Sequence, residues 1–402
     1  MINKFIFFFI ILCSVHFFGL HYRLGEHVYD LIDFSYFGLA FLLLGKYITG
    51  RTDSFLPKNE LVFAKPIIFF AGALVVSSLS GFYYHEQNPL LTLLAMRYFL
   101  YFLVFFCLIA LSVSKEYLIK VIVVFAFIYM FVFTLQLILF PTAIVPLGHT
   151  DKFDRGFLRL RLEGVGFITL TAFYALNTFL ITKRKVFIAL YLLCFIFIFI
   201  LGFRTLLATF LFSSFLLAFF AEKHIFKRLL SIIYTLVIVI VIVQFDIVQN
   251  FIIAMVDKTN EQVGQGDDYI RLMTFDFLFN KVNVDFGSLF FGNGMPFDGT
   301  PYGNLVLGYG ARDNGFIAGD LGLIGLVFNY GILSILAFLN IYRIAIFKKL
   351  PREYLYLNIF FFYLVISSFT SGEIFRAGIF GVQMIGLYLI VLISYENNKT
   401  AN

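Results

Sequence analysis

Charge is scarce in this chain. Only 13% of the 402 residues are charged, whereas 61% are hydrophobic and the mean hydropathy is +0.93. A soluble globule of this length would need far more polar surface to cover its core. The composition therefore excludes a soluble protein and predicts an integral membrane protein, with the lipid bilayer as its surroundings.

Tryptophan is absent and cysteine is rare. The aromatic content of 20% comes largely from 58 phenylalanines, which fits a lipid-facing surface better than a platform for stacking sugars. The three cysteines, Cys13, Cys107 and Cys194, lie inside apolar runs, where a thiol behaves as a small hydrophobic group. They give no indication of a disulfide framework or a metal site.

Several motifs are also missing. The net charge of +6 comes from short basic clusters between apolar runs, and no basic patch indicates a nucleic-acid partner. No GxxxxGK phosphate loop occurs, and no small-x-small cleavage site follows Leu20, so we expect the first apolar run to be a retained anchor. Nothing in the sequence calls for a metal or another cofactor.

Long apolar runs dominate what is present. A run of about 20 apolar residues is needed to cross the hydrocarbon core of a bilayer. The sequence predicts an all-α polytopic protein with about 12 such spans. We expect them near residues 4–21, 28–47, 62–82, 90–112, 118–140, 164–182, 186–203, 204–221, 229–250, 322–342, 354–371 and 375–394.

Basic residues in the short loops predict the orientation. If the amino terminus is cytoplasmic, the inner loops contain Lys183-Arg184-Lys185 and the cluster from Arg343 to Arg352, while the short outer loops contain almost no basic residues. Positive charge favours the cytoplasmic side. Both termini are therefore expected in the cytoplasm.

Two of the outer loops are too long to be simple connectors. We expect a single membrane domain over 1–402, with a first outer loop at 141–163 and a large one at 251–321. Long loops often carry function. Residues 268–279 of the large loop have the pattern of an amphipathic helix, and a glycine-rich run follows from Gly287 to Gly319. These glycines would allow close backbone approach, or they form only a flexible tether.

Arginines accumulate on the predicted outer side. A charge within or near lipid is costly and usually functional. Guanidinium groups gathered around one cavity would suit a phosphate or pyrophosphate ligand. The outer arginines are Arg97, Arg155, Arg159, Arg161, Arg204, Arg271, Arg312 and Arg376.

Each of these positions also has a purely structural alternative. Arg159 and Arg161 would lie on one side of an extended chain, where lipid headgroups are an alternative ligand. Arg97 lies inside a predicted span and would reach the interface by snorkelling. Arg204 would simply mark a turn between two spans. In the run from Arg312 to Gly315, Asp313 or Asn314 would cap the start of the next helix.

Motif order resembles that of the O-antigen polymerase and O-antigen ligase superfamily, the Wzy-type polymerases and their ligase relatives. The resemblance covers most of the chain and is densest over 155–330. It depends on motif order and topology more than on any single string. The motifs are Arg161-x-x-Gly164, Gly202-Phe-Arg204-Thr-Leu-Leu-Ala, Arg271, Gly292-Asn-Gly294 and Asp313-Asn314-Gly-Phe-x4-Leu321-Gly-Leu-Ile-Gly-Leu326.

This resemblance implies glycosyl transfer on the periplasmic face of the bacterial inner membrane, with an undecaprenyl-diphosphate-linked oligosaccharide as donor. It also implies work beside a chain-length regulator and a flippase. Arg161, Arg204 and Arg271 match the family's positions for holding the diphosphate. Ligases commonly have His-Asn where this chain has Asp313-Asn314, and the other outer histidines, His21, His27, His85 and His149, lie in other loops. This departure favours a polymerase.

The residues themselves support a metal-independent transfer. Preorganised arginines stabilise charge that develops on a leaving diphosphate, and a carboxylate accepts the proton of the acceptor hydroxyl. Asp313 is the first candidate for that base, followed by Asp320 and Glu163. Arg97, Arg159, Arg312, Asn314 and Arg376 are expected to contact substrate.

Three competitors remain. A ligase would transfer finished glycan to lipid A core or protein. A transporter or flippase would place its charges near the midplane, often in broken helices. A metal-dependent glycosyltransferase would need an acidic pair in an early outer loop, which Glu26, Asp30 and Asp33 imitate only loosely.

Overall fold

The computed structural model describes residues 2–20, 26–48, 61–145, 153–154, 157–158, 160, 162–221, 264 and 269–401. Helices dominate this part of the chain. In the amino-terminal half they are α1 (Ile2–Ser14), η1 (His16–Gly19), α3 (Glu26–Ile48), α4 (Ala64–His85), α5 (Pro89–Ala95), η3 (Arg97–Phe102), α6 (Leu103–Leu111), α7 (Lys115–Leu139), α8 (Val165–Thr182), α9 (Lys185–Ile200) and α10 (Arg204–Ala221).

The carboxy-terminal half contains shorter helices before its spans. They are α13 (Ile270–Asp276), η5 (Phe277–Val282), α14 (Phe286–Phe291), α15 (Pro301–Gly303), η6 (Asn304–Asp313), η7 (Ala318–Leu321), α16 (Leu323–Phe347), η8 (Arg352–Tyr354), α17 (Leu355–Ser371), η9 (Glu373–Phe375), η10 (Ala377–Ile379) and α18 (Phe380–Ala401). The two-residue strands β1 (Phe153–Asp154) and β2 (Phe157–Leu158) pair antiparallel inside the first long loop.

Seven described helices are long and apolar enough to cross a membrane. They confirm a helical membrane protein and correspond to the predicted spans near 62–82, 118–140, 164–182, 204–221, 322–342, 354–371 and 375–394. The predicted span at 90–112 is an apolar helix pair bent by 61° between Ala95 and Arg97. The predicted span at 229–250 lies outside the described residues.

Some predicted boundaries differ from the structure. The first apolar helix, α1, ends at Ser14, because His16, Phe17 and Phe18 adopt left-handed backbone angles. The last span begins at Phe380, and the residues assigned to its start lie in η9 and η10. The apolar helix α9 is shorter than a typical span, with 16 residues.

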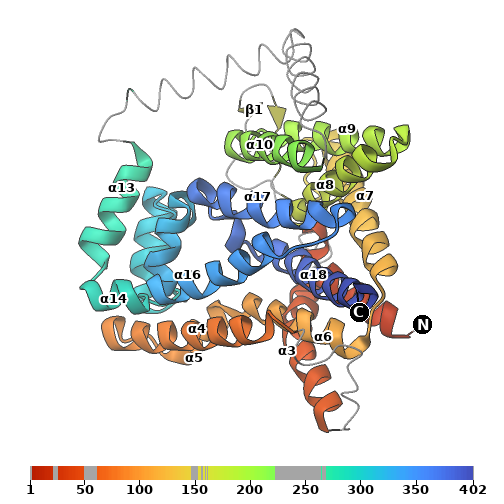
Figure 1. Ribbon diagram of the computed structural model, residues 1–402. Coiled ribbons are helices and arrows are strands. Elements are labelled where there is room, and N and C mark those ends of the chain that lie inside the picture. The colour runs from red at the N-terminus through yellow and green to blue at the C-terminus, as the bar shows by residue number, and fades with distance from the viewer. Residues whose placement is uncertain are drawn as a thin grey trace.

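The bundle has one large hydrophobic core to which the spans contribute. Figure 1 shows α17 and α18 in the middle of the bundle, with α8 to α10 on one side and α4 to α6 on the other. The middle of the bundle is aromatic. Phe338 of α16 packs against Phe70 of α4 and Phe375, with ring centroids 5.0 and 4.3 Å apart. These contacts hold segments together that are far apart in the chain.

The large loop has a smaller core of its own. Buried side chains from η5, α15, η6, the segment between η6 and η7, and the first turns of α16 pack together, namely Phe277, Leu278, Val282, Tyr302, Val306, Phe316 and Phe328. The predicted helix at 268–279 is confirmed as α13 and the start of η5. In Figure 1 the two chain termini lie at one end of the bundle, and α13 and α14 lie at the other. We call the latter the outer end.

Candidate functional site

Two predicted site residues meet at the start of α8. The Arg376 Nε lies 3.3 Å from the Glu163 Oε1, and their side chains are only 14% and 23% exposed. Glu163 precedes α8, whereas Arg376 lies between η9 and η10, 213 positions later in the chain. A largely buried pair of this kind keeps both groups charged where an isolated charge would be costly.

The turn before α18 is shaped around this ion pair. A Cβ added to Gly378 would collide with the carboxyl end and the Cβ of Glu163. A Cβ added to Gly166 would lie 3.1 Å from Ile379 Cγ1. Glycine at these two positions therefore permits η10 to approach the start of α8.

Arg204 begins α10 at the same end of the bundle. Helices α8 and α9 pack side by side and are joined by a short turn, so they run antiparallel. The second turn, at 201–203, therefore returns the chain to the end where Glu163 lies. Gly202 has a φ of +69° in this turn, a backbone angle that favours glycine. The turn explains the position of Arg204, which is half-buried at the start of α10, a helix that packs against α17.

Helix η7 packs on the same end of α17. A Cβ on Gly372 would lie 3.1 Å from the Gly319 carbonyl oxygen, and one on Gly322 would collide with the Phe369 carbonyl. The exposed Asp320 belongs to η7. Glu163, Arg204, Arg376 and Asp320 therefore all lie around the outer ends of α8, α10, α17 and α18.

The other predicted residues of the large loop form a second group. Helix α13 contacts η7, and the Phe277 ring packs 5.3 Å from that of Phe316. This packing brings α13, which carries Arg271, to the segment that follows Asp313. Among the residues that the structure describes, we find no ion pair or hydrogen bond for the Arg271 guanidinium.

Arg312 and Asn314 have structural partners within this second group. The Arg312 Nη2 lies 2.6 Å from Asp298 Oδ1, with both side chains mostly exposed. Asn314 donates to the Tyr309 carbonyl at 2.7 Å and so caps the end of η6. The expected cap at the start of the following helix is wrong, because η6 continues through Asp313 and α16 begins only at Leu323. Asp313 itself is exposed.

The acidic residue on the same helix as Arg271 already has hydrogen-bond donors of its own. Asp276 accepts hydrogen bonds from Asn280 and Lys281, and these contacts lower the pKa of its carboxyl. Asp276 therefore stays ionised beside Lys281, at the far end of α13 from Arg271.

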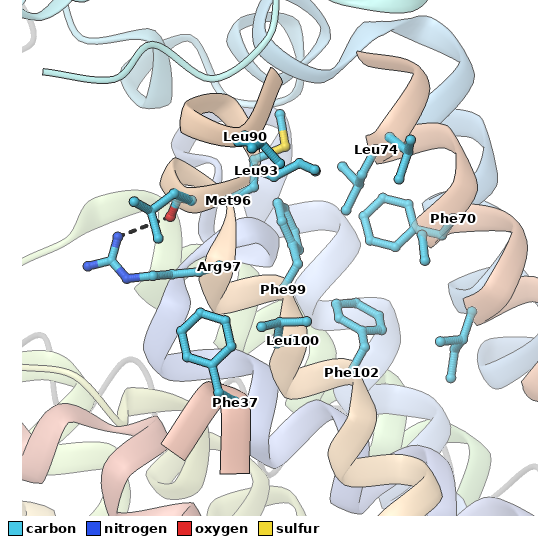
Figure 2. Close-up of a pocket in the computed structure, with 14 residues that line it drawn as sticks. Phe37, Phe70, Leu74, Leu90, Leu93, Met96, Arg97, Phe99, Leu100 and Phe102 are labelled. Atoms are coloured by element: carbon cyan, nitrogen blue, oxygen red, sulfur yellow. Dashed lines mark hydrogen bonds between the residues drawn. The ribbon is translucent and has the colours of Figure 1, made fainter. Parts of the chain in front are cut away.

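Arg97 lies apart, at the break between α5 and η3. Its Nε is 2.7 Å from Asp33 Oδ1 on α3, and its Nη1 donates to the Leu94 carbonyl. Arg97 therefore has an ion-pair partner that the sequence did not predict. Figure 2 shows its guanidinium at the edge of a cavity of about 400 Å³. Among the described residues that line this cavity, Arg97 is the only charged one, and the walls come from α3, α4, α5 and η3.

The aromatic wall of the cavity reaches the Arg376 region. Phe99 lines the cavity, and its ring centroid is 5.6 Å from that of Phe375, the residue before Arg376. Tyr98 stacks on Phe380, at the start of α18. An apolar cavity and the Glu163–Arg376 pair are thus separated by only a few side chains.

The sequence analysis missed one contact of the large loop. His85 Nε2 lies 2.7 Å from Asn293 Oδ1, and its ring stacks on Tyr302. His85 is the last residue of α4, outside the large loop in the sequence, and it meets Asn293 because this loop folds back along α4. Asn293 Nδ2 donates to the Phe328 carbonyl, which fixes the amide so that His85 Nε2 must be the donor. In the sequence, the Gly292-Asn-Gly294 motif was the feature that could have indicated this contact.

Arg155, Arg159 and Arg161 lie outside the described residues. Within the described ranges, no group of three or more His, Cys, Asp or Glu side chains is arranged to hold a metal ion.

Comparisons with protein-family models, with curated proteins and with solved structures found no match to this chain.

Proposed function

We propose that this protein is a polysaccharide polymerase. In this proposal it joins undecaprenyl-diphosphate-linked oligosaccharide units into an O-antigen or capsule-type polymer on the periplasmic face of the bacterial inner membrane. The observation that carries the proposal is the gathering of Glu163, Arg204 and Arg376 at one end of the bundle, beside η7. This arrangement supports binding of an anionic group where the membrane ends.

The proposed reaction is a direct displacement. The acceptor hydroxyl attacks the anomeric carbon of the donor, and the bond from that carbon to the diphosphate oxygen breaks. The bond's electron pair leaves with the undecaprenyl diphosphate, where Arg204 and Arg271 stabilise the added charge, together with Arg161 by family resemblance. The proton of the hydroxyl passes to a carboxylate, for which the exposed Asp313 and Asp320 are candidates.

The apolar cavity supports a lipid-linked donor. It offers about 400 Å³ between spans, lined by Phe70, Phe99 and other apolar side chains, with one guanidinium at its edge. An isoprenoid chain matches the apolar walls, and Arg97 at the edge matches a phosphate. Asp33 competes for Arg97, so this contact would be weaker than those made by an unpaired arginine.

A transporter is the second candidate, because of one specific observation. The helix pair broken at Met96 is the kind of interruption found at transporter binding sites. The charged residue at this break, Arg97, forms an ion pair with Asp33 on the adjacent helix α3, and its side chain is 36% exposed. A site along a path through the bundle would require a charge directed inward, so we favour the polymerase.

Deletion of the gene in its host, followed by gel analysis of the surface glycan, tests the proposal. We expect a lipid A core carrying a single repeat unit. Loss of all attached glycan, with polymer accumulating on its lipid carrier, would instead identify a ligase. Repeat units retained on the cytoplasmic side would identify a transporter, and an unchanged glycan ladder would contradict the polymerase.

A further inference from the structure

The segment after η5 runs down one span and returns. A Cβ on Gly287 would collide with the Tyr84 hydroxyl, near the outer end of α4. Five residues later, a Cβ on Gly292 would lie 2.5 Å from Ser77 Oγ, deeper along the same helix. The chain then returns towards the outer end. The Met295 carbonyl and the Phe297 amide both bond the side chain of Gln87, which lies beyond the end of α4.

This descent corresponds to about one third of the hydrocarbon core of a bilayer. Tyr84 and Ser77 are seven positions apart on α4, which corresponds to about 10 Å of helix. Helix α4 has 22 residues, about 33 Å, and therefore extends little beyond a hydrocarbon core of about 30 Å. The turn at Gly292 thus lies about 10 Å below the outer end of a helix that is just long enough to span.

Helix α16 gives an independent measure of the same depth. A Cβ on Gly292 would also lie 2.5 Å from the Tyr330 carbonyl carbon, and one on Gly331 would collide with Phe291. Gly331 is the kink of α16, with a φ of +81°, and lies eight positions inside that helix. The descending segment is therefore wedged between two spans.

Two backbone amides of the turn have hydrogen-bond acceptors in the protein, which favours a position in lipid. The Asn293 amide donates to the Phe328 carbonyl at 3.0 Å, and the Gly292 amide donates to the Ser288 carbonyl at 2.8 Å. The Asn293 side chain bonds His85, Asn283 and the Phe328 carbonyl. Non-helical backbone is tolerated at this depth because protein surrounds it.

The outward side of the segment is apolar. Phe286 and Phe291 are 70% and 41% exposed, and α4 also exposes apolar side chains, among them Leu79 and Phe82. No charged residue occurs from Phe286 to Phe297, whereas Asp285 and Asp298 flank this stretch. An apolar stretch of about 10 to 14 residues is too short to span and is typical of re-entrant or interfacial segments.

We infer that residues 286–297 form a re-entrant segment that enters the outer half of the bilayer, with Phe286 and Phe291 facing lipid. Residues 286–297 are then part of the membrane domain and lie outside the aqueous part of the large loop.

The absence of tryptophan allows a direct test on the full-length protein. Phe286→Trp introduces the only indole in the chain. The variant is reconstituted into vesicles whose acyl chains carry bromine near the headgroup. Its fluorescence should be quenched as strongly as that of Leu79→Trp, which marks the lipid-facing side of α4. Tyr309→Trp, on exposed η6, should be quenched by aqueous iodide instead.

Phe291→Trp provides a second reporter deeper in the segment. Strong bromolipid quenching of both phenylalanine variants would support the inference. Quenching by iodide as for Tyr309→Trp would overturn it, because the segment would then be in water. Protection from both quenchers would also overturn it, because protein and not lipid would cover these side chains.

Discussion

At the scale of single residues, the ion pair of Glu163 and Arg376 differs from the other ion pairs of the outer end. It is mostly buried, whereas Arg312–Asp298 is exposed and Arg97–Asp33 is partly exposed. Buried pairs are strongly coupled because neither charge is solvated alone. Exposed pairs contribute little.

We therefore predict a measurable coupling between Glu163 and Arg376. In a double-mutant cycle with Glu163→Gln and Arg376→Met, the coupling energy for unfolding in detergent should be about 1–3 kcal/mol. The same cycle with Asp298→Asn and Arg312→Met should give a smaller value. Equal couplings would contradict the expectation that burial makes Glu163–Arg376 the more strongly coupled of the two pairs.

A separate prediction about Arg204 and Arg271 follows from the proposed transfer reaction. Arg204→Ala and Arg271→Ala should each abolish polymer while the protein remains inserted, because the leaving diphosphate loses a cation. Surface glycan on a gel and protein amount in the membrane are the two measurements. Arg343→Ala, at the other end of α16, is the matched control and should leave polymer unchanged. Ordinary polymer in both outer-end variants would refute their role.

At the scale of elements, the seam between α4 and the large loop depends on glycine. A Cβ on Gly81 would lie 2.9 Å from the Asn293 carbonyl oxygen and 3.2 Å from Gly294 Cα, which are backbone atoms that cannot rotate away. Gly72, on the same helix, has no atom within 4 Å of an added Cβ. The two positions form a matched pair.

We predict opposite outcomes for the two alanine variants. Gly81→Ala should destabilise the protein by about 1–3 kcal/mol through overpacking and loosen the loop. Gly72→Ala should be neutral or stabilising, because alanine is the better helix former. Thermal unfolding and limited proteolysis within 286–303 would measure both effects. Identical behaviour of the two variants would mean that the loop does not pack on Gly81.

The broken span illustrates what patterns within an element cannot predict. Residues 90–112 contain no proline or glycine, yet the helix bends by 61° around Met96. The bend is accompanied by contacts with other helices. Arg97 bonds Asp33 on α3, and the Tyr98 hydroxyl bonds that of Tyr330 on α16. Because these partners lie in other helices, the hydrophobic pattern of residues 90–112 cannot predict them.

At the scale of the whole molecule, the two termini lie at the opposite end from α13 and α14 (Figure 1). Combined with the basic inner loops, this arrangement predicts cytoplasmic termini. A fluorescent protein that folds only in the cytoplasm should be bright when fused after Asn402. Alkaline phosphatase inserted at the exposed Asp298-Gly299 turn should be active, because it would be periplasmic. The reverse pattern would invert the proposed orientation.

Composition and hydropathy alone determined that the chain is a helical membrane protein and where seven of its spans lie, because each span needs only its own run of apolar residues. Only the tertiary structure decided which charges meet. Glu163 meets Arg376, and His85 meets Asn293, across 213 and 208 positions of sequence. Such pairings depend on how glycines and aromatic rings allow helices to approach, and that depends on packing between segments, which a one-dimensional pattern does not contain.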